Sequence, residues 1–579
     1  MTACSNSMRS FLLIFWLVFG MTTALCLVGV RAGAAPQSAE IPRAPTSGGG
    51  YRIAGTVVSK ADGRPLNRAR ITVRDAKDAK RFQSGVTSED GKYEFTGLPA
   101  AKYSLTGAKR GFISASYDQH DQYSTAIVTG TGLETEALVL RLAPDAVISG
   151  KVLDETNEPV RHAVVTLYYN DHSLGVDQIH QAGSSQTNDL GEYELTPFTP
   201  GTYFLSASGK PWYAVHPHSE MVPSGRAQSK ADQQAEAPPL VDQPLVDRAL
   251  DVAYPLTYYP NGTEADDAAP ILILGGERVQ ADLHLNPVPS LRLLFRMPDD
   301  GKHGYQIPQL EQPAFDGSTF IQMTGGSMIS PGVVELTGIP AGRYNVHLRG
   351  QGSFVQMNGV DLAKDGEEVD LSRGEALSNV KFSVQVPAEA TLPAHLSVGL
   401  RSGNRTVSAS QAVDAKGETE LQQVAAGRYE VAVWGPGKVY SVARMSAEGA
   451  QVSGRTLSVA AGSSPSVSLT VASGSAEIEG IVTRARKGLA GAMVVLVPEN
   501  PELDRALFRR DQSDLDGTFL LRNVVPGSYT LLAIENGWDL DWSHPVVIAA
   551  YLKHGRKIEV GNQTGRPMNI AEPIEVQSK

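Results

Sequence analysis

Short runs of alternating apolar and polar residues recur along the chain, and turns that contain glycine join them. After such a glycine, apolar residues fall at the second and fourth positions, as Tyr93 and Phe95 do after Gly91. A period of two predicts a strand with one buried face, and glycine accepts the positive φ that a tight turn requires. A second tight turn and a further strand follow each time. The repeated pattern therefore predicts antiparallel hairpins.

The spacing between the turn glycine and a later tyrosine defines five copies of this unit. The two residues are 12 positions apart in each of the pairs Gly91 and Tyr103, Gly191 and Tyr203, Gly332 and Tyr344, Gly417 and Tyr429, and Gly517 and Tyr529. A tyrosine at the start of a strand can bury its ring while its hydroxyl bonds to nearby backbone, as in the tyrosine corner of β-sandwiches. We therefore expect five equivalent tyrosine corners in five consecutive sandwiches.

The first, second and fifth copies also share an upstream block of strand, turn and strand. In the first copy this block is Ile53-Ala54-Gly55-Thr56-Val57, then Gly63-Arg64-Pro65-Leu66, then Ala69-Arg70-Ile71-Thr72-Val73. Together with the later Asp-Gly and Tyr positions, it resembles the carboxypeptidase regulatory-like domain. The resemblance is weak in the third and fourth copies. It implies a transthyretin-like (prealbumin-like) sandwich of the carbohydrate-binding-like group, found in tandem in exported bacterial proteins, and it implies no peptidase activity.

The expected organisation is all-β, with five tandem antiparallel β-sandwiches, immunoglobulin-like or prealbumin-like, after an N-terminal signal or anchor helix. Residues 221–251, rich in Ser, Gln, Asp, Ala and Pro without a sustained period, are predicted to be a disordered insertion in the second sandwich. One short helix is expected at 502–508, after Asn500 and Pro501. The predicted segments are a leader at 1–35, a flexible linker at 36–50, and sandwiches at 51–143, 144–288, 289–388, 389–473 and 474–579.

The leader allows two interpretations. Twenty mostly apolar residues, 11–30, follow Arg9 and precede small residues that include Ala34 and Ala35. This order is typical of a cleaved secretory signal, although twenty residues are also long enough for a membrane anchor. Both interpretations place the sandwiches outside the cytoplasm, in the periplasm, the cell envelope or the extracellular space. The only cysteines, Cys4 and Cys26, lie in this leader, so the remaining chain has no disulfide and no thiol chemistry.

Composition and charge exclude several classes of protein. The chain has 579 residues, 41% of them hydrophobic and 7% aromatic, which is enough for packed cores. Its net charge is −11, without a basic run, so nucleic acid is excluded as the expected partner. Contact with a membrane is expected only through the possible N-terminal anchor.

Motifs for catalysis and metal binding are missing. The sequence contains no HExxH, HxxE, GxSxG, P-loop or GxGxxG pattern, so no catalytic, cofactor-binding or metal-binding residues are predicted. The pair His216 and His218 has no third ligand at a recognisable spacing, which favours an exposed loop. Residues 512–517 faintly resemble the start of a calcium loop, but a hairpin turn is the better interpretation.

Aromatic residues at the ends of loops are the only candidates for ligand contacts. Phe112, Trp212 and Trp538 each lie nine residues after the corner tyrosine of their unit. Because aromatic faces are broad and apolar, such residues can stack on sugar rings, or they can close the open end of a sandwich. The possible stacking residues are Trp212, Tyr213, Trp538 and Trp542.

These observations favour a non-catalytic, exported, multi-domain binding or structural protein of the bacterial envelope or exterior. A glycan or an envelope protein is the expected partner, and carbohydrate binding is the first function to test. The alternatives are a purely architectural spacer or adhesin-like stalk and, with less support, an accessory subunit of a secreted enzyme.

Overall fold

The computed structural model describes residues 50–216, 247–298, 307–321, 325–349, 354–386, 392–402, 405–406, 411–436, 438–474, 476–561 and 566–579. The leader and nearly all of the linker at 36–50 therefore lie outside the described residues, as does most of the insertion expected at 221–251. Within the described ranges, no helix has the length and apolar character needed to cross a membrane.

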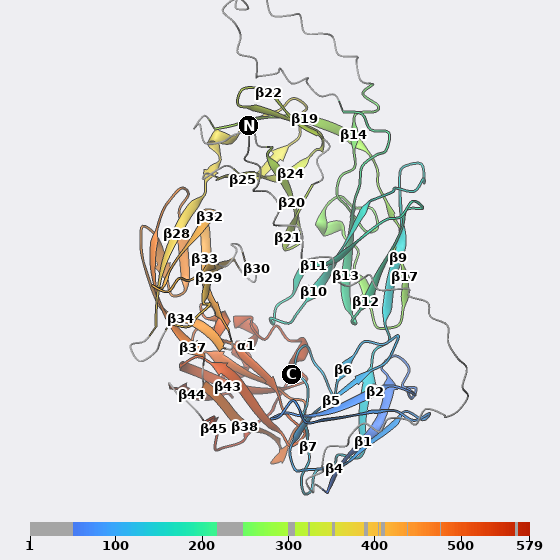
Figure 1. The fold of residues 1–579 in the computed structure, drawn as a ribbon, viewed down its shortest axis with the longest axis vertical. Helices are drawn as coiled ribbons and strands as arrows, with labels where there is room; N and C mark the ends of the chain where they lie inside the picture. Colours follow the sequence, from blue (N-terminus) through green and yellow to red (C-terminus); the bar gives the residue numbers. More distant parts are fainter. Residues whose placement is uncertain are drawn as a thin grey trace, which may run out of the picture. The chain divides into compact units, whose positions relative to one another are not determined.

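The first and second sandwiches each consist of two facing sheets (Figure 1). The first contains the sheets β4-β1-β8 and β3-β2-β5-β6, with β7 also on β5. Its strands are β1 (Tyr51–Ser59), β2 (Arg70–Asp75), β3 (Phe82–Val86), β4 (Lys92–Leu98), β5 (Lys102–Ala108), β6 (Ala115–Ser116), β7 (Ile127–Val128) and β8 (Leu138–Leu142). The elements of the second are β9 (Ala146–Leu153), β10 (Val164–Asp171), β11 (Gln178–Gln186), β12 (Glu192–Phe198), β13 (Gly201–Ser208), β15 (Thr257–Tyr258), η2 (Ala265–Asp267), β16 (Ile271–Ile273), β17 (Arg278–Gln280) and β18 (Leu283–His284).

The third and fourth sandwiches follow, the fourth as a single sheet that folds over its own core. The elements of the third are β14 (Val252–Ala253), β19 (Val288–Arg296), β20 (Gln309–Ala314), β21 (Gly317–Phe320), β22 (Gly325–Ser330), β23 (Val333–Pro340), β24 (Gly342–Arg349), β25 (Phe354–Leu362), β26 (Glu368–Asp370), η3 (Leu371–Arg373) and β27 (Glu375–Ala376). Those of the fourth are β28 (Ser378–Gln385), β29 (Ser397–Ser402), β30 (Arg405–Thr406), β31 (Gln411–Ala412), β32 (Glu418–Val424), β33 (Gly427–Gly435), β34 (Lys438–Glu448), β35 (Gln451–Ser453), β36 (Thr456–Val459) and β37 (Ser466–Gly474).

The fifth sandwich contains the sheets β39-β38-β42 and β41-β40-β43-β44 and carries the single α-helix found in the described ranges. Its elements are β38 (Ala476–Arg484), β39 (Lys487–Gly488), β40 (Met493–Pro498), η4 (Arg505–Leu507), β41 (Arg509–Gln512), β42 (Thr518–Val524), β43 (Gly527–Glu535), η5 (Gly537–Asp539), α1 (Pro545–Leu552), β44 (Arg556–Val560), β45 (Met568–Asn569), β46 (Ile574–Glu575) and β47 (Gln577–Ser578). The expected all-β architecture of tandem sandwiches is confirmed.

One pairing pattern recurs in all five sandwiches. The first long strand of each pairs antiparallel with the strand after the turn glycine and parallel with a later strand. In the first sandwich these partners of β1 are β4 and β8. The parallel pairs in the other four sandwiches are β9 with β17, β19 with β26, β28 with β37, and β38 with β45. The sheets are thus mostly antiparallel, as expected, with a parallel pairing at a fixed place.

The five expected tyrosine corners are present. Each of the tyrosines is buried, and its hydroxyl donates to the backbone carbonyl four residues earlier, over distances of 2.7–3.1 Å. The five turn glycines have φ between +69° and +87°, where residues with a Cβ are strained. Each glycine carbonyl also accepts a backbone N–H at 2.7–2.9 Å, from the first long strand of its sandwich or, in the third sandwich, from Met297 directly after that strand. The five units predicted from the spacing of glycine and tyrosine therefore share the same set of hydrogen bonds.

A buried hydroxyl four residues before the turn glycine supports the three units with the stronger resemblance. Thr87, Thr187 and Ser513 each accept a backbone N–H and donate to a backbone carbonyl of the loop that precedes the second strand, at 2.6–2.9 Å. One side chain thus satisfies two backbone groups that the loop would otherwise bury without partners.

Replacing Thr187 by Val tests this support, because valine keeps the shape and removes the hydroxyl. Ala163 N–H and Val160 C=O lose their partner, and an unsatisfied buried group costs about 1–3 kcal/mol. We expect a loss of about 2–4 kcal/mol in the unfolding free energy of the second sandwich, measured by denaturant titration. Thr187→Ser, which restores the arrangement found at Ser513, should remain within about 1 kcal/mol of the parent. An equal loss in both variants would contradict this role.

Two expectations about boundaries and helices are corrected. Strand β28, placed in the third sandwich by a boundary at 388, pairs with β32 and β37 and so belongs to the fourth. The expected helix at 502–508 is only the 3-10 turn η4, because the adjacent Leu507 and Phe508 pack into different clusters, as in extended chain. Helix α1 was not expected; it begins with Pro545 and buries Ile548 against the outer face of the sheet that contains β43.

Candidate functional site

The loop after β13 carries the aromatic pair predicted for ligand stacking. Trp212 is 81% exposed, and its ring meets that of Tyr213 edge-on at 5.8 Å. The hydroxyl of Tyr213 donates to Glu155, which also accepts from Tyr254 at 3.3 Å. Burial, followed by the Glu155 carboxylate, raises the pKa of Tyr213 to about 12, so the phenol stays protonated and able to donate. Tyr213 is therefore held in place, while the indole of Trp212 faces solvent.

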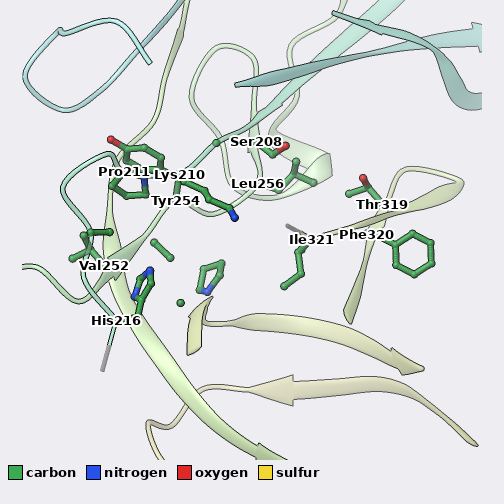
Figure 2. A pocket seen from close by; sticks show the side chains of 15 residues that line it. Ser208, Lys210, Pro211, His216, Val252, Tyr254, Leu256, Thr319, Phe320 and Ile321 are labelled. Carbon is green, nitrogen blue, oxygen red and sulfur yellow. The ribbon is translucent and has the colours of Figure 1, made fainter. Parts of the chain in front are cut away.

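A small pocket lies next to this loop, between the second and third sandwiches (Figure 2). Its volume is about 120 Å³. Figure 2 shows His216 and Val252 on one side and Phe320 and Ile321 on the other. Other lining residues are Ser208, Lys210, Pro211, Ala214, Tyr254, Leu256 and Thr319. A pocket of this size and largely apolar lining can hold a small apolar group, and it is too small for a whole ligand.

The exposed loop expected at His216 is corrected, because its side chain is only 8% exposed and has structural partners in this pocket. Its Nδ1 lies 2.9 Å from Asp251 Oδ1 and 3.3 Å from Ser290 Oγ. The other histidine of the pair, His218, is outside the described residues, and no cluster of three or more potential metal ligands occurs in the described ranges. The hydrogen bonds of His216 join the loop after β13 to the start of the third sandwich.

Arg510 on β41 joins the fifth sandwich to the first and the second. Its side chain is only 3% exposed, and Nη2 lies 3.1 Å from Asp121 Oδ2 of the first sandwich. The same nitrogen donates to Ser173 O of the second sandwich at 2.7 Å. The guanidinium also lies over the rings of Trp542 and Tyr123, at 4.2 and 5.2 Å from their centroids. A planar, permanently charged group can make all of these contacts at once.

The structure places Trp538 and Trp542 within this junction. Trp538 stacks on His120 of the first sandwich, with ring centroids 4.9 Å apart and planes 6° apart, and its indole N–H donates to Gly491 O at 3.2 Å. Trp542 is buried and packs on Phe508. Both indole rings are thus packed against other side chains, whereas the ring of Trp212 is open to solvent. Stacking on a ligand stays a prediction for all the aromatic candidates.

A buried polar contact continues the junction along the first sandwich. Gln512 Nε2 donates to Thr125 Oγ1 at 2.7 Å and to Asp118 O at 2.5 Å. Further along, Lys102 Nζ lies 2.5 Å from Asp514 Oδ2. Residues 512–517, considered above as a calcium loop, thus form a hairpin turn whose polar groups bond to the first sandwich.

A cavity of about 980 Å³ opens at the same junction. We call it the junction cavity. Its walls are Lys60, residues 113–122 and part of β8 from the first sandwich, the end of β10 with the turn that follows it and the turn at 199–200 from the second, and Arg510 from the fifth. Its volume is at the upper end of the roughly 300–1,000 Å³ usual for small-molecule sites.

Sequence patterns had not singled out Arg510, His120 or Asp121. The one available signal was the charged segment Arg509-Arg510-Asp511-Gln512, which lies between apolar strands where an alternating pattern was expected. Side chains of such a strand that face away from the core need either solvent or another domain, and here they meet another domain.

Comparison with known proteins identifies one domain. Residues 52–131 match the family model of the carboxypeptidase regulatory-like domain. The match covers the first sandwich up to the residues before β8, while the second and fifth sandwiches share its buried hydroxyl, turn glycine and tyrosine corner. No curated protein matches the chain.

Among solved structures, the similarities are distant. The TIE protein of Bacillus anthracis is 14% identical over 55% of this chain and 49% of its own, about half its length, with a TM-score of 0.17. A streptococcal ancillary pilin is 10% identical over 55% of this chain and 98% of its own, with a TM-score of 0.19. The minor pilin GBS52 of Streptococcus agalactiae is 12% identical over 41% of this chain and 97% of its own, with a TM-score of 0.19. Similarity at this level does not transfer the function of those proteins.

Proposed function

Because residues 52–131 form a carboxypeptidase regulatory-like domain, we propose that this chain is an exported, non-catalytic binding protein of the bacterial envelope or exterior, and that it binds carbohydrate. The observation that carries the carbohydrate proposal is the exposed indole of Trp212. The pattern of charge, apolar run and small residues in the leader supports export.

The loop that carries Trp212 has the properties of a stacking platform for a sugar. An indole face exposed at 81% is a large apolar surface, and a sugar ring presents a face of C–H groups that can cover it. Tyr213 is fixed through Glu155, so the base of the platform is ordered before a ligand arrives. The pocket of about 120 Å³ beside the loop has room for a small apolar substituent of the sugar, such as an acetyl group.

A glycan array with the chain from residue 36 onward tests this proposal. We expect binding to a defined set of glycans and a loss of about two- to tenfold in affinity for Trp212→Ala, since stacking on one aromatic ring is worth about 0.5–1.5 kcal/mol. Trp434→Ala, which removes a tryptophan that is 37% exposed on β33 of the fourth sandwich, is the matched control and should bind as the parent does. Absence of binding to every arrayed glycan would reject carbohydrate binding and favour the architectural spacer.

The contact between the first and fifth sandwiches favours one form of the architectural alternative. A stalk works by keeping its domains in an extended row, whereas here Arg510, Gln512 and Asp514 of the fifth sandwich bond to the first. An architectural role would therefore be that of a closed support that presents its loops in fixed positions.

A further inference from the structure

We propose that the junction cavity is a second ligand site and that it binds a neutral oligosaccharide. This inference rests on the proposed carbohydrate function, and it adds a site composed of three sandwiches. The cavity of about 980 Å³ is eight times as large as the pocket beside Trp212, at about 120 Å³. Its volume suits a ligand of several sugar units.

The charges in the wall exclude a strongly charged ligand. The wall has three basic residues, Lys60, Arg141 and Arg510, and three acidic residues, Asp118, Asp121 and Asp171. Two of these charges compensate each other, and a third group is hydrogen-bonded within the protein. Arg510 pairs with Asp121, and Asp171 accepts from the Ser173 hydroxyl at 2.8 Å. A ligand with a high net charge would find no excess of the opposite sign.

The remaining lining matches the two kinds of surface on a sugar. Half-buried Tyr117 and Tyr169, together with the exposed side chains of Val139 and Leu174, offer apolar contacts to C–H faces. Hydroxyl, amide and carboxylate groups lie along residues 114–122 and can bond to sugar hydroxyls. Apolar walls with a limited number of polar groups are typical of small-molecule sites.

The polar wall is ordered by contacts on both of its sides. Within the loop, Gln119 accepts from Ser116 N and donates to Asp121 O, each at 2.8 Å. From the fifth sandwich, Gln512 bonds to Asp118 O, and Trp538 stacks on His120. A wall held in this way loses little conformational freedom when a ligand binds.

The fifth sandwich therefore contributes positioning residues, which hold the wall of the cavity in place. Arg510 forms part of the wall and also fixes Asp121, while Gln512 and Trp538 hold the loop from behind. The site is complete only when the first and fifth sandwiches are in contact.

Filling the cavity with a larger side chain is the test, because it blocks a ligand without removing a core residue. Leu174 and Val139 are 44% and 38% exposed, so Leu174→Trp and Val139→Trp should leave stability unchanged. Leu190→Trp, at a turn of the second sandwich outside the cavity and 58% exposed, is the matched control. All three changes are made in the Trp212→Ala background, so that the proposed platform does not contribute.

Binding is measured by calorimetry with oligomers of two to six units of glucose, mannose or N-acetylglucosamine. We expect Trp212→Ala to retain binding to at least one oligomer, and both filling variants, but not the control, to weaken it at least tenfold. Arg510→Ala should weaken the same binding, and Arg510→Lys should do so less, since the charge remains.

Three outcomes would overturn the inference in distinguishable ways. Complete loss of binding in Trp212→Ala would place all binding at the platform and leave the proposed function intact. Retained binding that neither filling variant weakens would locate the ligand outside the cavity. Failure of the parent chain to bind any oligomer or arrayed glycan would reject both the cavity and the proposed function.

Discussion

Replacing Arg510 by Ala is expected to weaken the contact of the fifth sandwich with the first and the second. The change removes the ion pair with Asp121 at 3.1 Å, the hydrogen bond to Ser173 O at 2.7 Å and the contact with the Trp542 ring at 4.2 Å. It also leaves the Asp121 carboxylate without its cation inside the contact. Because the Asp121 side chain is 33% exposed, the cost stays below the roughly 3–5 kcal/mol of a fully buried pair and above the roughly 0–1 kcal/mol of an exposed one. We expect a larger radius of gyration in small-angle X-ray scattering and earlier thermal unfolding of the first sandwich.

Arg522→Ala is the matched control for this experiment. Arg522 lies on β42 of the same sandwich, and its ion pair with Glu477, at 3.8 Å, is solvent-exposed. Such pairs contribute about 0–1 kcal/mol, so scattering and melting should match those of the parent. An Arg510→Ala chain as compact and as stable as the control would show that the junction does not depend on Arg510.

A buried carboxyl in the fifth sandwich is expected to make stability fall as the pH rises. Burial raises the pKa of Asp511 from 3.8 to about 6, and the neighbouring Asp514 carboxylate acts in the same direction. Between about pH 4 and pH 6, the folded chain therefore holds a proton that the unfolded chain has lost. Because the folded state binds more protons there, the contribution of Asp511 to stability decreases through this window and stays low above it.

Asp511→Asn tests this dependence, because the amide stays neutral and its oxygen can still accept from Leu520 N, at 2.7 Å in the parent. A shift of two pKa units corresponds to about 3 kcal/mol. We expect the variant to be more stable by about 2–3 kcal/mol at pH 7 and nearly unchanged at pH 4, in denaturant titrations at both pH values.

Asp90→Asn is the control, because the pKa of Asp90 is shifted in the opposite direction to that of Asp511. Hydrogen bonds from Lys92 and Ser88 lower the pKa of exposed Asp90 to about 2, so its ionised form is the stabilised one. This substitution should lower the free energy of unfolding slightly at pH 7, and it should not raise it. A parent whose stability rises between pH 4 and pH 6, with Asp511→Asn following the same curve, would contradict the role of Asp511.

Features set by short-range sequence were predictable. The corner tyrosine and the turn glycine are 12 residues apart, and both depend on local requirements, a positive φ for the glycine and a backbone carbonyl four residues before the tyrosine. Even the degenerate third and fourth sandwiches keep them, since Tyr344 and Tyr429 make the same bond as the others. Side chains elsewhere can change without breaking these bonds.

Features set by contacts between sandwiches were not predictable. Arg510 and Asp121 are 389 residues apart, and nothing near either residue indicates the other. The environments of the aromatic residues nine positions after the corner tyrosine were likewise not predictable from the sequence. Phe112 packs against the core of its own sandwich, Trp212 is exposed and Trp538 stacks on another domain. One position in the repeat thus has three environments, because the environment depends on which domain lies nearby.

The distance in sequence between Arg510 and Asp121 also sets an order of events during synthesis. The first sandwich is complete once Leu142 has been made, yet its partner on β41 lies several hundred residues further along the chain. At roughly 5–20 residues per second, those 389 residues take about 20–80 s to appear. Throughout that interval the loop around His120 lacks its contacts with the fifth sandwich. A chain truncated before β41 would therefore have the first four sandwiches without this junction, so the junction forms only after the fifth sandwich has been synthesised.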